Sequence, residues 1–157
     1  MESNQDLSVE RLIRSLDGET ASLHEHYRGE VIVGLMFAAA MATERSASAK
    51  VATMIAAGMR AEFLNHLQEQ GANAIERAEW EAVVASRFLA YRKSLENYTG
   101  FEPPWKLGRE FFWNVIGEQL QVAMSIKIST LYLLAARDKC QGLLNLHGPA
   151  LYLPEPV

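Results

Sequence analysis

Two pairs of histidine and glutamate residues have a spacing that could bind a metal ion or transfer a proton. His26 and Glu30 are four residues apart, and so are Glu62 and His66. Side chains four positions apart share one face of an α-helix, so each pair would present an imidazole beside a carboxylate. If the two helices packed antiparallel, the four side chains could meet and hold a divalent cation.

A structural role for these pairs is the simpler interpretation. Ferritin-like di-iron bundles place Glu and His three residues apart, and zinc proteases use His-Glu-x-x-His; the chain has neither spacing. It also lacks Gly-x-Ser-x-Gly, a phosphate-binding glycine loop and Cys-x-x-Cys. We therefore predict salt bridges or helix caps at these positions, no catalytic residue and no cofactor. The metal site remains an alternative hypothesis.

Two other segments combine large apolar side chains with proline, as binding surfaces often do. The first is 101–105, and the second is the apolar tail, 143–157. Stiff apolar groups of this kind serve as anchors at protein interfaces. The predicted partner-binding residues are Phe101, Pro103, Pro104, Trp105, Leu146, Leu151, Tyr152 and Leu153. Alternatively, both segments pack against the helices of their own chain.

The element expected to position these residues is a long apolar helix over 109–140. Between Phe111 and Ala136 only Glu118 and Lys127 are charged. A helix that is apolar on most of its circumference is normally surrounded by other helices, so we predict that this one is central. Its apolar residues recur with a helical period: Phe111, Val115, Val122, Ile126 and Leu133. A narrow polar strip, expected to face solvent or a second copy, comprises Asn114, Glu118, Gln121, Ser125 and Ser129.

Four shorter helices are expected before it. Apolar spacing predicts a short helix over 9–16, a second from Ser22, a third ending at Gly71 and a fourth ending at Gly100. Asn73 and Glu76 have the spacing of a capping box at the start of the fourth. The paired prolines predict that 101–106 is not helical. The second helix carries a smooth stripe for close packing, formed by Gly34, Ala38 and Ala42.

The polar segment 43–48 is the expected break between the second and third helices. A continuous helix over 22–70 would be about 73 Å long at roughly 1.5 Å per residue, too long for a compact domain. We therefore predict a break there, with a serine capping the next helix. Without a break, the chain would form an elongated, dimeric rod.

Composition limits the class of protein. The 157 residues suit one domain, 1–157, with a frayed N-terminus over 1–6 and an irregular tail over 143–157. The net charge of −4 argues against nucleic acid, and polar residues within the apolar segments argue against a membrane span. The N-terminus lacks the features of a secretory signal, and Cys140 is the single cysteine, so we expect a cytoplasmic protein.

The sequence therefore predicts an all-α, bundle-like domain of about five helices. Its apolar segments exceed what one small core requires, so we expect a protein partner and a homo-oligomer. The predicted function is a protein–protein interaction module without catalysis, acting as a regulator, inhibitor or assembly subunit. Two alternatives stay open: a helical metal-binding protein or enzyme, and an acidic neutraliser of a basic toxin or nucleic-acid enzyme. No motif identifies a known family.

Overall fold

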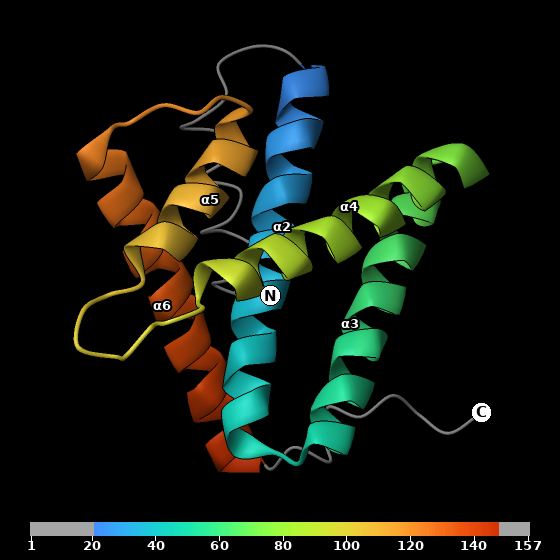
Figure 1. Ribbon diagram of the computed structural model, residues 1–157. Coiled ribbons are helices and arrows are strands. Elements are labelled where there is room, and N and C mark those ends of the chain that lie inside the picture. Colours follow the sequence, from blue (N-terminus) through green and yellow to red (C-terminus); the bar gives the residue numbers. More distant parts are fainter. Residues whose placement is uncertain (1–20, 148–157) are drawn as a thin grey trace.

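The computed structural model describes residues 21–147, with side chains over 27–146, and this part is a bundle of helices without strands (Figure 1). The five helices are α2 (Ala21–Ser46), α3 (Ala49–Glu69), α4 (Ala74–Ser94), α5 (Trp105–Ile116) and α6 (Ala123–His147). The predicted all-α bundle is thus confirmed. The helix expected over 9–16 lies outside the described residues. No helix in the described part combines the length and the apolarity that crossing a bilayer requires.

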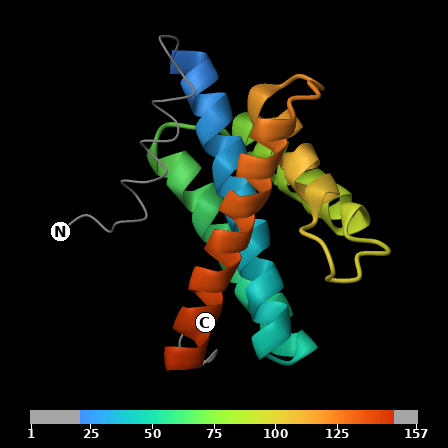
Figure 2. The same ribbon diagram turned by 90° about the vertical axis from the view of Figure 1, so that its left-hand side faces the viewer.

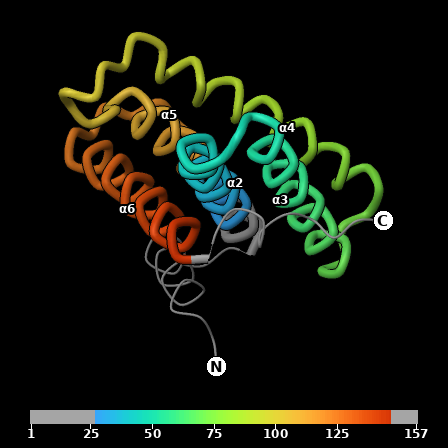
Figure 3. Tube along the Cα trace, turned by 90° about the horizontal axis from the view of Figure 1, so that it is seen from below, coloured from blue at the N-terminus to red at the C-terminus, as the bar shows by residue number. Residues whose placement is uncertain are grey.

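The central element is α2 rather than the predicted helix over 109–140. α2 contacts each of the other four helices. Seen from below, it lies between α6 and α3, with α4 and α5 along one side (Figure 3). Val31, Val33, Ala38 and Ala42 of α2 have no solvent exposure. Because α2 is apolar on nearly all sides in its middle, it fits the position in which neighbours cover every side.

The predicted helix over 109–140 is two helices, because the chain turns at Gly117. This glycine has φ of +77°, and its N–H donates to the Trp113 carbonyl at 2.8 Å, a common way for a helix to end. The indole N–H of Trp113 then donates to the Leu120 carbonyl at 2.8 Å and holds the turn. The chain reverses, and α6 packs against α5. The predicted polar strip is divided by this turn, and Val122, expected in the core, is 43% exposed.

The predicted break between the second and third helices is confirmed. α2 ends at Ser46, and the Ser48 hydroxyl accepts the Val51 N–H at 3.3 Å, which caps α3. The alternative of one continuous rod is therefore wrong. The capping box is also confirmed: the Glu76 N–H donates to Asn73 Oδ1 at 2.9 Å, and the Asn73 N–H donates to the Glu76 carboxylate at 3.4 Å.

Two other helix ends differ from the prediction. α4 ends at Ser94, six residues before Gly100, and the backbone takes left-handed conformations at Asn97 and again at Gly100. α5 begins at Trp105, so Trp105 and Lys106 are helical although 101–106 was predicted not to be. The reason is that proline restricts the residue before it, whereas the residues after it are free to begin a helix.

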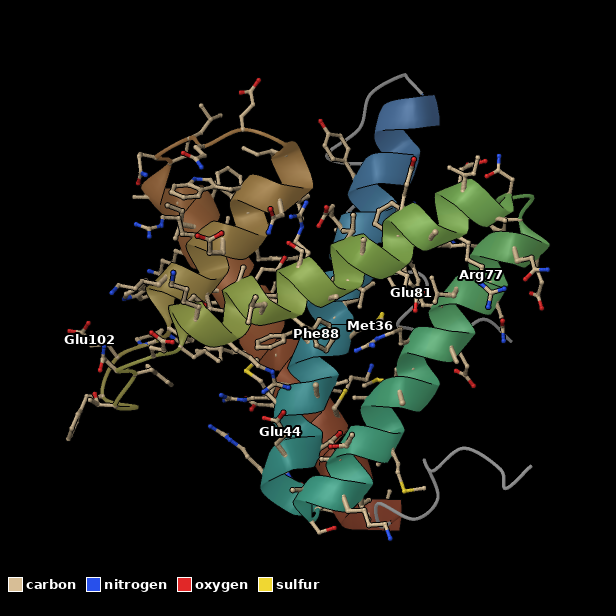
Figure 4. The ribbon with its side chains drawn as sticks, turned by 45° about the vertical axis from the view of Figure 1, so that its right-hand side comes forward. Met36, Glu44, Arg77, Glu81, Phe88 and Glu102 are labelled. Atoms are coloured by element: carbon tan, nitrogen blue, oxygen red, sulfur yellow. The ribbon has the colours of Figure 1, made fainter. Side chains whose placement is uncertain are left out.

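The core forms two clusters on opposite sides of α2. In one, the Phe37 ring makes an edge contact with Phe88 at 5.4 Å between centroids. In the other, Phe63 makes an edge contact with Trp80 at 5.8 Å. Phe88 also packs against the second cluster, and it points toward Met36 of α2 in Figure 4, so it connects the two.

The smooth stripe predicted on α2 is buried, as expected. Gly34 lies against the ring of Phe111 so closely that an added Cβ would overlap it. Ala38 and Ala42, the other members of the stripe, have no exposure. Small side chains here let α5 approach the backbone of α2.

Candidate partner-binding surface

Glu30, one of the four alternative metal ligands, forms a buried ion pair. Its carboxylate accepts hydrogen bonds from Nε and Nη2 of Arg87 on α4, at 3.1 and 2.8 Å. Only 2% of the Glu30 side chain is exposed, against 27% of Arg87. The hydrogen bond to Glu30 raises the pKa of Arg87. Because a buried carboxylate requires a partner, Arg87 explains this position without a metal ion.

The structure does not gather the other alternative ligands around Glu30. Glu62 and His66 are both exposed on α3. The side chain of His26 lies outside the described residues. Among the side chains of 27–146, no three His, Cys, Asp or Glu residues are grouped closely enough to hold a metal ion.

A second buried polar contact joins α4 to α5. Asn114, which was predicted to lie on the polar strip, donates from Nδ2 to the Tyr91 hydroxyl at 3.2 Å. Tyr91 has no solvent exposure, and this burial raises its pKa. The Glu30–Arg87 pair lies one turn away on α4. Together the two contacts join α2, α4 and α5, and they favour this arrangement of the three helices because each buried polar group has its partner in it.

The loop between α4 and α5 presents the most exposed aromatic side chain described. Phe101 is 93% exposed, and Trp105, at the start of α5, is 37% exposed. Pro103 is half-buried, whereas Pro104, also predicted to bind a partner, is buried in this chain. Glu102 projects away from the helices (Figure 4). The predicted binding segment thus exposes Phe101 and Trp105 to solvent, and the prolines between them restrict the backbone of the loop.

The tail predicted to be irregular over 143–157 begins as helix, because α6 continues to His147, and the rest of the tail lies outside the described residues. Leu151, Tyr152 and Leu153 follow the described part of the chain. Leu146, in the last turn of α6, is 74% exposed. It is therefore exposed to a partner.

The largest set of exposed apolar side chains lies on α6, where the sequence predicted a buried helix. Met124, Ile128 and Leu131 are 64%, 57% and 47% exposed. They share one side of the helix with the exposed Ala135, at steps of four, three and four residues. We call these four residues the outward face of α6. In Figure 2, α6 lies in front of the other described helices, and none of them covers it.

The opposite side of α6 faces the core. Thr130 and Leu133 are buried there, and Leu144 continues the same side. In the loop before α6, Leu120 (44%) and Val122 (43%) are also exposed. Exposed apolar residues scattered singly are ordinary, but a contiguous group on one helix marks an interaction site.

The signal that could have revealed the outward face is the position of Lys127. Lys127 is exposed and lies one turn from Leu131. Asp138, about three turns beyond Lys127, is exposed on the same flank of the helix. The charges mark the side of α6 that no other helix of the described part covers.

No protein-family model, curated protein or solved structure matches the chain.

Proposed function

We propose that this chain is a helical protein–protein interaction module that binds another polypeptide through the outward face of α6. The observation that carries the proposal is the exposure of Met124, Ile128 and Leu131 on one side of a single helix. The partner surface that would fit is an apolar helix face bordered by charged residues, because the side-chain ridges of one helix pack into the grooves of another. The module would act in the cytoplasm as a regulator, inhibitor or assembly subunit.

Burial of these exposed apolar side chains would contribute to association. Complete burial of a Met, Ile or Leu side chain contributes roughly 1.5–3 kcal/mol. Scaled by the exposed fractions, the three outward residues together with Leu120 and Val122 offer roughly 4–8 kcal/mol. This gain must exceed the loss of translational and rotational freedom on binding, so the contact is expected to be moderate in strength and to depend on each of these residues.

The loop carrying Phe101 is a second contact in this proposal. The loop and the beginning of α6 lie on the same side of the molecule (left in Figure 1). An aromatic side chain that is 93% exposed resembles the anchors that fill pockets on a partner.

The proposal is tested by matched arginine variants. Ile128→Arg places a charge on the outward face, and Leu89→Arg places the same charge at a 72% exposed leucine of α4. Tagged wild-type and variant chains would be used to capture binding proteins from the native cell, with quantification by mass spectrometry. Proteins bound by the wild type and by Leu89→Arg should be lost with Ile128→Arg, since loss of a central contact typically weakens binding about 30-fold or more.

Circular dichroism must show that both variants keep the helical content of the wild type. If a folded Ile128→Arg variant captures the same proteins in the same amounts as the wild type, the outward face of α6 is not the contact surface, and the proposal is wrong.

A further inference from the structure

We propose that the partner of the outward face is the outward face of a second copy, in an antiparallel pair of α6 helices with Leu131 on the two-fold axis. The inference rests on the proposed function and names the occupant of that surface.

The spacing of the outward residues suits a pair of parallel or antiparallel helices. Apolar residues at alternating steps of four and three form the seam of two-helix packing, and Met124, Ile128, Leu131 and Ala135 follow those steps. A two-fold interface also requires a surface that complements itself. With the axis at Leu131, Ile128 of one copy lies beside the partner's Ala135, so a large side chain meets a small one.

Charge decides the direction of the two helices. Lys127 and Asp138 are exposed and are eleven residues apart, which is about three helical turns, so they lie on the same flank of the outward face. In a parallel two-fold pair, each flank faces the opposite flank of the partner, so Lys127 and the partner's Asp138 would lie on different sides of the interface. An antiparallel pair instead brings opposite charges together on that flank. The antiparallel direction is therefore favoured.

An axis at Leu131 keeps this charge pair within reach. With the axis at Leu131, the partner's Asp138 lies three residues, or about 4.5 Å, along the helix from Lys127, and symmetry gives two such pairs. Asp138 already accepts a hydrogen bond from Arg137 at 3.0 Å, and 68% of its side chain is exposed, so it can accept a second cation. Moving the axis to Ala135 would instead place the partner's Lys139 against Leu131 and lose the Lys127 pair.

Cysteine cross-linking tests this register. Leu131→Cys and Ala135→Cys would each be made with Cys140→Ser, so that each chain has one thiol. In the proposed pair, the thiols at position 131 meet at the axis. Those at position 135 are about 12 Å apart along the helices, too far for a disulfide. Mild oxidation should therefore cross-link the Leu131→Cys chain and leave the Ala135→Cys chain uncross-linked. The reverse result would overturn the register.

Sedimentation velocity tests the pairing itself with native side chains. Between about 1 and 200 μM, the wild type and Leu89→Arg should shift from monomer toward dimer, and Ile128→Arg should remain monomeric. Lys127→Glu should weaken the dimer, and Lys127→Glu combined with Asp138→Lys should restore it.

A wild type that remains monomeric throughout this range would overturn the inference. If Ile128→Arg nevertheless lost captured proteins in the experiment above, the proposed function would stand with a different partner. Failure of the charge exchange to restore the dimer would overturn the proposed antiparallel register.

Discussion

Replacement of Arg87 by methionine would leave the Glu30 carboxylate buried without its partner. Removal of one member of a buried ion pair typically costs about 3–5 kcal/mol of the free energy of unfolding. The Arg87 side chain is 27% exposed, so water can reach part of the space it leaves, and the expected loss is smaller, about 2–3 kcal/mol. For a chain of this length, that loss lowers the melting temperature by roughly 5–10 °C.

The matched variants separate the cost of an unpaired charge from the cost of lost packing. Glu30→Leu combined with Arg87→Met removes both charges and keeps apolar volume at both positions. It should recover stability to within about 1 kcal/mol of the wild type, because well-packed apolar residues often replace a buried pair without loss. Glu44→Gln removes one partner of the exposed pair with Arg92, whose side chains are 44% and 49% exposed. That change should cost less than about 1 kcal/mol.

Urea unfolding followed by circular dichroism gives each of these free energies at neutral pH. Equal slopes of the unfolding free energy against urea concentration must accompany the comparison, so that the differences reflect stability. The reasoning fails if Arg87→Met costs no more than Glu44→Gln, or if the double variant is as unstable as the sum of its single variants.

Three further predictions concern α5 and α6. Gly108→Ala should destabilise the fold by about 1–3 kcal/mol, because a Cβ there would overlap the side chain and backbone of Thr130, whereas Gly142→Ala, with no neighbour within 4 Å, should stabilise α6 by about 0.5–1 kcal/mol. Urea unfolding should give these opposite signs, and a stabilised Gly108→Ala would contradict the close contact. Burial raises the pKa of Tyr132 to about 12, above its ordinary value of about 10, so its contribution to stability is complete below pH 10 and is lost as pH rises toward 12. Tyr132→Phe should therefore lose less stability than the wild type over that range, and an identical loss would refute this assignment. Burial raises the pKa of the Cys140 thiol, although Lys139 partly opposes the effect, so iodoacetamide should modify it more slowly in the folded chain than in denaturant, as measured by mass spectrometry; equal rates would count against burial.

Local sequence signals located several helix ends correctly. Ser48 and the Asn73–Glu76 pair are predictable because a cap is made within a few residues of the chain, and its hydrogen bonds depend on little else. The stripe from Gly34 to Ala42 was also predictable, since only small residues permit a close approach of helices. Fold class followed from the helical period of the apolar residues.

The turn at Gly117 could not be predicted from spacing alone. Apolar residues continue on both sides of it with a nearly unbroken helical period, and no proline marks the end of α5. A single glycine is tolerated within a helix at a cost of about 1 kcal/mol, so its presence does not decide between a helix and a turn. Packing of α5 against α6 decides it, and this packing depends on residues far apart in the sequence.

The role of Glu30 was unpredictable for a related reason. Its spacing from His26 suggested a local pair, but its partner is Arg87, 57 residues away. Helical spacing identifies which residues share a face, and it does not identify the residue that a neighbouring helix places opposite. The exposure of Phe101 was easier to predict, because an aromatic residue close to paired prolines has few ways to be buried locally.

Charge density separates the outward face of α6 from an ordinary solvated helix face. Leu89 on α4 is more exposed than Ile128, but Arg92 and Lys93 follow it by one turn, and such isolated apolar residues are common on protein surfaces. On α6, the stretch from Met124 to Ala135 has one exposed charge, Lys127, at its flank. A helix that is apolar on two opposite sides needs two layers of cover, and the described helices supply one. The same scarcity of charge that made α6 resemble a core helix in the sequence is therefore the reason to expect a second helix against its outward face.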